Sequence, residues 1–434
     1  MSSILTNNSA MVALQTLKSI NQNLGKVQSE ISTGKTVESA KDNAAVWAIS
    51  KVMSSDVSGF EAISDSLSLG QATVGVALDA AEGVTDLLTE IKGKIVNSQE
   101  DNVDREKIQT DIEALRSQVS SIVGAAQFNG LNLLSNTDTE AGSGTTSILS
   151  SLDRAADGSV VDSSIDVVKQ DLGTNQESID ASGTFTAAAV PNTVINTATA
   201  SADIDLSALA VAGTAVTINF VGTDADANTF TPADYTNATT GGTTVAEAIA
   251  GDVTYVVRDG DTAADIGSAL ADAFATYAAE NGLDTSIINL EANSTGLTAS
   301  KTATFTDAGD NIQVRVASVV SDENVIGGGL AALADIDVST AEGSEAALAA
   351  IEGLIQTSID SAAALGSAGS RIETQSNFVS ALTDNLKSGI GALVDADMEA
   401  TSAKLQALQT QQQLGVQSLS IANQAPQTIL SLFR

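Results

Sequence analysis

The stretch LKSINQNLGKVQSEI (residues 17–31) carries apolar side chains at alternating steps of three and four residues. These side chains are Leu17, Ile20, Leu24, Val27 and Ile31. Such heptad spacing is typical of a helix that buries one apolar seam against a partner helix. The same spacing recurs in residues 108–122 and 372–393, near both ends of the chain. We therefore predict long helices at both ends, which pair with each other or with another copy of the chain.

A stripe of the same kind lies close to the C-terminus. Its positions are Leu405, Leu408, Gln412, Gly415, Leu419 and Ala422. Residues 405–433 contain no charged side chain. Within an assembly of identical copies, like charges would face each other at every repeat, and uncharged faces avoid that repulsion. The sequence therefore favours a helix packed among copies of itself, and the leucine spacing argues against the alternative of a disordered polar tail.

Turn and capping residues mark where these helices end. Gly34 interrupts the first stripe and is a typical helix stop. Residues 39–43 (SAKDN) supply capping side chains in front of an apolar run that begins at Ala44. The dipeptide Asn129–Gly130 lies beside apolar residues and predicts a tight turn in a hairpin.

The middle of the chain differs from both ends in charge. Of the 54 acidic and 19 basic residues that give a net charge of −35, residues 138–345 hold 31 acidic and 5 basic ones. Segments 214–222 and 310–320 have the pattern of strands, and 253–282 reads as strand, turn and helix, with Asp261 or Thr262 as N-cap and Gly282 after its end. We predict helical ends that close one structure, with a β-rich α+β region, of one or two small domains, inserted between them.

Composition excludes several classes of function. The chain has no histidine and no cysteine, which removes imidazole bases, thiol nucleophiles, disulfides and zinc, haem or iron–sulfur sites built on them. Its negative charge disfavours binding to nucleic acid or anionic lipid. Neither a signal peptide nor a transmembrane segment is visible in the sequence. We expect no enzymatic activity, no catalytic residue, no cofactor and no metal, and neither nucleic acid nor membrane as a partner.

Two acidic patterns resemble binding or catalytic sites. Asp224, Asp226 and Asn228 occupy the first ligand positions of a calcium loop, but Thr229 and Tyr235 stand where such a loop needs Gly and Glu. We interpret this segment as a solvated polar turn. A second pair, Asp395 and Asp397, precedes a helical stripe, and we interpret it as negative charge at a helix N-terminus rather than as a catalytic pair.

Three motifs together resemble a known family. They are ISTGKTVESAKDNAAVWAIS (31–50), AQFNGLNLL (126–134) and LQALQTQQQLGVQSLSIANQAPQTILSLFR (405–434). In order and position they resemble the two ends of bacterial flagellin, the filament subunit of the flagellum, in its alphaproteobacterial form. The resemblance covers about 140 residues at the front and about 90 at the back.

The resemblance implies a division into three parts. Residues 1–40 with 395–434 would form a terminal coiled-coil core domain, and 41–137 with 346–394 an inner helical domain with a β-hairpin. Residues 138–345 would form the outer, surface-exposed variable region. The resemblance further implies that apolar residues of the terminal helices pack in the filament core. These residues are Leu17, Ile20, Leu24, Val27, Ile31, Leu405, Leu408, Leu419 and Ala422.

The implied function is assembly into the extracellular filament used for swimming. The implied route is secretion as an unfolded chain through the flagellar type III export channel, followed by addition at the filament tip. The expected partners are other copies of the chain in a helical homopolymer, an export chaperone, the filament cap, hook-junction proteins and other flagellins that share a filament.

One stretch departs from the pattern of many flagellins. In LLTEIKGKIVNS (87–98), Glu90, Gly93 and Lys94 replace the Arg, Glu and Leu of a stretch that the vertebrate Toll-like flagellin receptor reads. Because reversed charge at an interface removes attraction and correct pairing, we expect weak or absent receptor activation.

Two alternatives belong beside this interpretation. A hook–filament junction protein shares flagellin-like ends, but the intact motif at 31–50 and the match through residue 434 favour the filament subunit. A secreted adhesin with coiled-coil ends and a β-rich middle would need a signal or anchor segment, and none is visible.

Overall fold

The computed structural model describes residues 7–100, 102–155, 159–187, 193–224, 226, 228–237, 253–305, 307 and 309–432. The chain divides into two compact units. The first comprises the described parts of 1–65, 151–162 and 375–434, and the second those of 66–150 and 163–374. Among the described residues, no helix is both long and apolar enough to cross a membrane.

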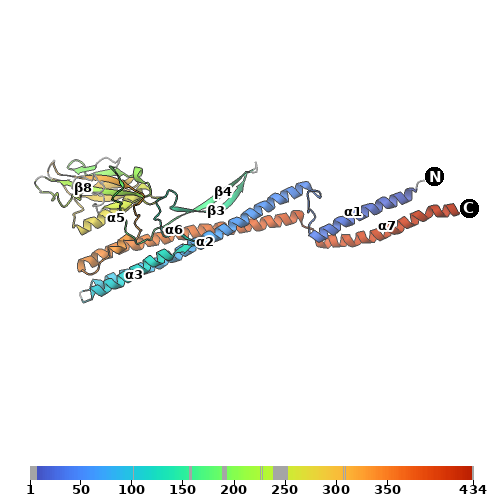
Figure 1. Ribbon diagram of the computed structural model, residues 1–434, viewed down its shortest axis with the longest axis horizontal. Helices are drawn as coiled ribbons and strands as arrows, with labels where there is room; N and C mark the ends of the chain where they lie inside the picture. The colour runs from blue at the N-terminus through green and yellow to red at the C-terminus, as the bar shows by residue number, and fades with distance from the viewer. Residues whose placement is uncertain are drawn as a thin grey trace. The chain divides into compact units, whose positions relative to one another are not determined.

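Long helices occupy both ends of the chain, as the stripes predicted (Figure 1). In sequence order they are α1 (Asn8–Thr33), α2 (Ala44–Ser98), α3 (Arg105–Ala125), α6 (Ala341–Val394) and α7 (Met398–Leu432). The predicted fold class, helical ends around a β-rich middle, is confirmed.

The predicted helix boundaries coincide with capping residues. α1 ends at Gly34, which adopts the left-handed conformation at φ 70° and donates its N–H to the carbonyl of Glu30 at 2.9 Å. At the start of α2, the Asn43 side chain accepts the N–H of Val46 at 3.2 Å. Asn129 and Gly130, at φ 52° and 84°, form the turn between β1 (Gln127–Phe128) and β2 (Leu131–Asn132).

In the second unit, α2 buries an apolar seam. The buried positions of α2 follow the heptad spacing, at Val74, Ala77, Ala81, Val84, Leu88, Ile91 and Ile95. Hydroxyl pairs link this seam to α6, with 2.8 Å between the oxygens of Thr85 and Ser358 and 2.9 Å between those of Ser98 and Ser344. Each buried hydroxyl in these pairs is therefore hydrogen-bonded, as burial requires.

One residue of the predicted stripes lies outside the seam. Leu393 is exposed, whereas its neighbour Val394 is buried at the last position of α6. The carbonyl of Val394 accepts the N–H of Thr36 at 2.7 Å, so the chain turns there and the three-four spacing no longer applies.

A two-stranded ribbon precedes the β-rich middle. It consists of β3 (Thr145–Arg154) and β4 (Val160–Val168). Its side chains lie close to α2: a Cβ added at Gly70 would meet Ile148 Cδ1 at 2.5 Å, and one added at Gly59 would meet Leu152 Cδ1 at 2.9 Å. Glycine at these two positions lets the ribbon approach the helix closely.

The β-rich module (the described residues of 184–320) holds two antiparallel sheets. One has the order β5–β12–β8–β9 with β6 also on β12, and the other β10–β11–β7. The strands are β5 (Thr184–Ala187), β6 (Thr193–Asn196), β7 (Ser201–Asp205), β8 (Thr214–Thr223), β9 (Thr254–Val256), β10 (Asn289–Asn293), β11 (Gly296–Ser300) and β12 (Asn311–Val320). The strands predicted at 214–222 and 310–320 are therefore confirmed as β8 and β12.

Helix α5 (Ala263–Glu280) packs on both sheets of the module. Thr262 and Asp265 form a reciprocal capping box at its start, and Gly282 follows its end at φ 61°, as predicted. Phe274 is 1% exposed and lies in one apolar cluster with residues of the sheets, such as Phe220 and Leu297. The module thus has its own core, with short 3-10 turns at Ser207–Leu209 (η1) and, after the module, at Ala331–Ala334 (η2).

Candidate assembly surface

Helices α1 and α7 lie side by side in the first unit (Figure 1). Asn7 both caps α1, by accepting the N–H of Ala10 at 3.1 Å, and donates its side-chain amide to the carbonyl of Ala422 at 2.8 Å. Further along, the Gln412 amide donates to the Asn21 side chain at 2.7 Å. Neutral amides therefore fix the register between the two ends of the chain.

The predicted stripes lie on the covered faces of these two helices. Val27 is 1% exposed and Leu408 8%. The other predicted positions are half-buried, namely Leu17, Ile20, Leu24, Ile31, Leu405, Leu419 and Ala422. The structure extends the seam to Ala10, Ala13 and Thr401, which the sequence reading missed although they continue the same spacing. The role of these residues in a filament core stays a prediction.

Gly415 marks a close contact between the helices. A Cβ at this position would lie 3.3 Å from Leu17 Cδ1 and 3.8 Å from Ile20 Cδ1. The absent side chain therefore makes room for two apolar residues of α1, which explains a glycine in the middle of the C-terminal stripe.

The breaks before α2 and before α7 are joined to each other. Lys35 and Asp395 form an isolated antiparallel bridge, and the N–H of Ala396 donates to the carbonyl of Gly34 at 2.8 Å. The Asp397 carboxylate accepts the N–H groups of Glu399 and Ala400 at 3.0 and 3.1 Å. The interpretation as helix N-terminal charge is confirmed for Asp397 but not for Asp395, which lies in the bridge after α6.

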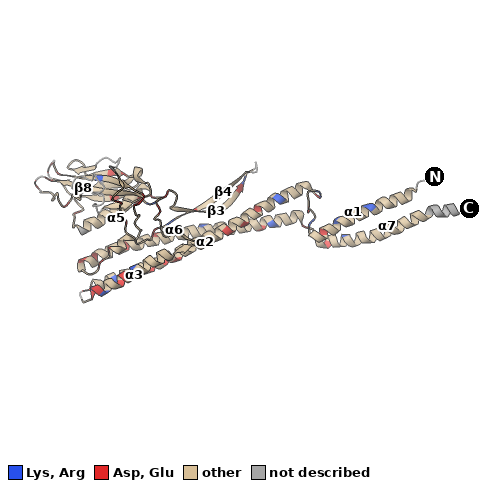
Figure 2. Cartoon of the chain, in the orientation of Figure 1, with Lys and Arg blue, Asp and Glu red and all other residues tan. Residues whose placement is uncertain are grey.

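Both helices of the pair also carry large apolar side chains that are exposed. Met11, Val12 and Leu14 are 58–64% exposed on α1. On α7 the exposed residues are Leu414, Val416 and Ile421. Charged side chains are sparse on α1 and α7, as Figure 2 shows for the described part of both helices. Large apolar side chains exposed on helices with so little charge are typical of surfaces that other proteins cover.

The stretch 87–98 lies in α2. Glu90 and Gly93 are exposed, and a Cβ at Gly93 would meet nothing within 4 Å. Lys94 is half-buried, and its Nζ lies 2.6 Å from Asp111 Oδ2 on α3. The hydrogen bond from Lys94 to Asp111, more than any other contact, raises the pKa of Lys94 above its ordinary value. Lys94 is therefore engaged within the subunit, whereas Glu90 and Gly93 face solvent.

The rejected calcium-like loop lies next to a third carboxylate that the sequence did not reveal. Carboxylate oxygens of Asp224, Asp226 and Asp310 lie within 4.8 Å of one another. The Asp224 carboxylate accepts the N–H groups of Thr229 and Phe230 at 2.9 and 3.0 Å, so it holds a polar turn. The expectation that this turn is solvated is wrong for Asp224, which is 5% exposed. Desolvation first, and then the neighbouring carboxylates, raises the pKa of Asp226.

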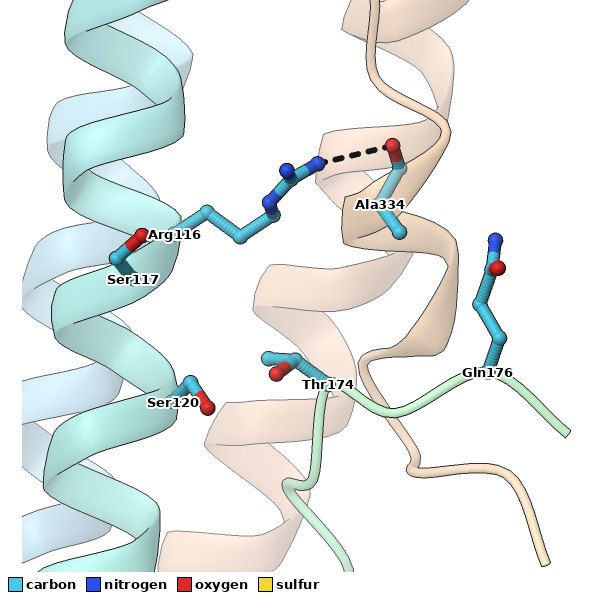
Figure 3. A pocket seen from close by; sticks show the side chains of 6 residues that line it. All are labelled: Arg116, Ser117, Ser120, Thr174, Gln176 and Ala334. Carbon is cyan, nitrogen blue, oxygen red and sulfur yellow. Dashed lines mark hydrogen bonds between the residues drawn. The ribbon is translucent and has the colours of Figure 1, made fainter. Parts of the chain in front are cut away.

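A polar depression of about 480 Å³ lies beside α3 in the second unit (Figure 3). Arg116 crosses it and donates from Nη1 to the carbonyl of Ala334 at 3.0 Å. The other lining residues are Ser117, Ser120, Thr174 and Gln176. Their hydroxyls and amide have no carboxylate or imidazole among them that could activate a nucleophile, so these six residues do not form a catalytic set.

Comparison with known proteins identifies the helical ends. Residues 4–139 match the bacterial flagellin N-terminal helical region, and residues 348–433 match the bacterial flagellin C-terminal helical region. Flagellin A of Rhizobium meliloti is 35% identical to this chain, with all of both chains covered. A flagellin of Bartonella bacilliformis is 31% identical over 96% of each chain.

Solved structures give a weaker likeness. A flagellar hook-associated protein-3 from Legionella pneumophila is 12% identical, covers 79% of this chain and 98% of its own, and has a TM-score of 0.34. So low a score does not establish a shared fold. The two matched regions and the full-length relatives carry the assignment instead: the chain belongs to the bacterial flagellins, in their alphaproteobacterial form, and is a structural subunit of the flagellar filament.

Proposed function

We propose that neighbouring copies of the subunit cover the exposed apolar side chains of α1 and α7, and that these contacts build the filament core. The observation that carries the proposal is the exposure of Met11, Val12, Leu414, Val416 and Ile421, on several sides of two helices that carry little charge. Burying such side chains releases about 25 cal/mol for each Å² of apolar surface, and identical copies provide this burial without charge repulsion.

The same physics explains why assembly and ordering go together. A helix pair with a single narrow seam buries too little apolar surface to offset the conformational entropy lost when both helices become ordered. We therefore infer that α1 and α7 are stable helices only among neighbours. The packing positions are those of the predicted stripes, and Leu408, buried to 8% exposure, lies near their centre.

The division of the chain follows from this role. In our proposal, residues 1–40 with 395–434 form the coiled-coil core domain, 41–137 with 346–394 the inner helical domain, and 138–345 the outer region. The chain leaves the cell through the flagellar type III export channel with an export chaperone. It then assembles beneath the filament cap, beyond the hook-junction proteins, and together with any other flagellins of the same filament.

The proposed role is structural and not enzymatic. The absence of histidine and cysteine from the whole sequence supports this inference. So does the polar depression beside α3, because its arginine is bonded to a backbone carbonyl and none of its six lining residues carries a carboxylate or an imidazole.

Negative-stain electron microscopy of the purified chain tests the assembly proposal. After seeding or salting out, we expect long filaments of uniform width from the full chain and none from a chain lacking residues 405–434. Near-ultraviolet circular dichroism of the tyrosines, all of which lie in the β-rich module, checks that the truncated chain stays folded. A full-length chain that remains monodisperse even with seeds would contradict the proposal and favour a junction protein or an adhesin.

We further propose that the stretch 87–98 activates the vertebrate flagellin receptor weakly or not at all. The exposed Glu90 presents a negative charge where the recognised pattern has Arg. A receptor reporter assay with purified monomer should stay near background, and the variant Glu90→Arg should raise the response. Strong signalling by the unchanged monomer at nanomolar concentration would disprove this proposal.

A further inference from the structure

Two segments connect the helical part of the second unit to the β-rich module. The first connector (169–180) leads into the module and the second connector (321–336) leads out of it. They pair with each other through backbone hydrogen bonds, from the N–H of Gly328 to Asn175 at 2.8 Å and from that of Leu330 to Gly173 at 2.9 Å. A Cβ at Gly328 would lie 2.0 Å from the carbonyl oxygen of Gly173, so glycine is required for this approach.

Arg258, in the loop between β9 and α5, reaches both connectors from within the module. Its Nε donates to Asp171 Oδ2 at 3.0 Å, and its Nη2 donates to the carbonyl of Gly327 at 2.7 Å. Its Nη1 donates to the Tyr255 hydroxyl at 3.0 Å. A planar guanidinium presents these donors in a fixed fork, so the three partners must hold fixed relative positions.

The cluster around Arg258 is buried and internally bonded. The side chain of Asp171 is 4% exposed and that of Arg258 18%. Asp171 also accepts the N–H of Gly173 at 2.9 Å. Asp261 Oδ2 accepts both the Tyr255 hydroxyl at 2.7 Å and the backbone N–H of Arg258 at 2.8 Å. Because a buried charge left without its partner is costly, every member of this cluster depends on the others.

The loop between β9 and α5 that carries Arg258 also binds the segment that follows the β1–β2 hairpin. The Asp259 carboxylate accepts the N–H of Gly144 at 2.8 Å, and its carbonyl accepts the Asn136 side-chain amide at 3.1 Å. On the other side, α3 binds the second connector: Gln109 donates to the carbonyl of Ile336 at 3.2 Å and accepts the N–H of Val338 at 3.0 Å. A continuous set of polar contacts therefore runs from α3 through the connectors to the module.

We propose that Arg258, with Asp171, Tyr255 and Asp261, is a joint that fixes the orientation of the β-rich module on the helical part of the second unit. Only five basic residues lie between 138 and 345 among 31 acidic ones, and Arg258, with 18% of its side chain exposed, bonds both connectors. Of these four residues, only Tyr255 belongs to the module's apolar core around α5 and the sheets, and Arg258, Asp171 and Asp261 lie outside that cluster. Loss of the Arg258 side chain should therefore loosen the module's orientation without unfolding the module.

Spin-label distance measurements test the joint. The chain has no cysteine, so labels at Ser121→Cys on α3 and Ala275→Cys on α5, both exposed positions, report one distance. In the full-length monomer we expect a narrow distribution. The variant Arg258→Met removes the charge but keeps much of the volume, and it should broaden the distribution at least twofold. Arg258→Lys retains the charge but not the fork, and it should give an intermediate width.

A matched arginine in the same module is the control. Arg315 lies within β12, and its Nη2 donates to Gln313 Oε1 of the same strand at 2.8 Å, so Arg315→Met should leave the distribution narrow. Hydrogen exchange gives a second readout: in Arg258→Met, the amides of Gly328 and Leu330 should exchange at least tenfold faster while those of β8 and β12 stay protected. An unchanged distribution and unchanged exchange in Arg258→Met would overturn the proposal. So would equal loss of protection throughout the module, because Arg258 would then act in folding and not in orientation.

Discussion

The terminal helices and the β-rich module complete their apolar cores in opposite ways. Within the described parts of α1 and α7, the apolar side chains below a tenth exposure are Val27 and Leu408. In the module, one cluster around Phe274 joins residues of both sheets and α5. The module therefore finishes its core within one chain, whereas the helix pair leaves several large apolar side chains exposed.

Aromatic residues account for much of this difference. They make up only 3% of the chain, yet all three tyrosines lie in the module. There the rings form contacting pairs, such as Phe220 with Phe274 at 5.3 Å and Phe230 with Tyr235 at 5.3 Å between centroids. Large rings bury much area for each ordered residue, whereas the alanines, glutamines and leucines of α7 do not. The difference predicts that substitutions in the two regions separate assembly from stability.

The largest effect is expected at Leu408. The variant Leu408→Asp places a charge in the seam between α1 and α7, where identical copies would repeat it at every subunit. We expect a soluble subunit with a folded module that forms no filaments under electron microscopy. Leu408→Met keeps the apolar volume and should still polymerise. Normal filaments from Leu408→Asp would show that this seam is not part of the assembly core.

The next effect is expected inside the module. Phe274 is 1% exposed, so Phe274→Ala removes a buried ring and should lower the free energy of unfolding of the module by about 3–5 kcal/mol. Urea unfolding of the monomer measures this change, with Thr276→Ala on the exposed side of the same helix as control. Filaments should still form wherever the module stays folded. Loss of assembly by a subunit with a folded module would contradict the separation of the two regions.

Two helical glycines, one in the module and one in α2, predict smaller changes in stability of opposite sign. A Cβ at Gly267 in α5 would lie 1.9 Å from the carbonyl oxygen of Gly296, so Gly267→Ala should destabilise the module by about 1–3 kcal/mol. At Gly75 in α2 a Cβ would meet nothing within 4 Å, so Gly75→Ala should stabilise that helix by about 0.5–1 kcal/mol. Thermal unfolding of both variants checks the opposite signs. Equal shifts would mean that helix propensity alone decides the outcome.

Local patterns in the sequence predicted the elements but not the contacts between distant ones. The heptad at 17–31, the cap at Thr262 and the turn at Asn129–Gly130 are each encoded within a few residues, and the structure bears them out. The neighbours of Asp224 and of Arg258 lie up to 87 residues away in sequence. No spacing rule connects residues so far apart, because sheet pairing and loop docking decide which of many acidic residues meet.

The smallest expected effect is on the pH dependence of stability. Asp180 accepts the Ser321 hydroxyl at 2.6 Å and the N–H of Ser182 at 2.9 Å, and these bonds, that of Ser321 first, lower the pKa of its carboxyl below the ordinary value. A lowered folded-state pKa means stability that is present above about pH 4 and is lost as the pH falls through the folded value. The melting temperature of the second unit, which contains both connectors, should therefore fall with acid less steeply in Asp180→Asn than in the unchanged chain. The Gln412–Asn21 contact between α1 and α7 is neutral, so Gln412→Ala should leave the slope of melting temperature against pH unchanged. A slope altered by Gln412→Ala but not by Asp180→Asn would contradict this prediction.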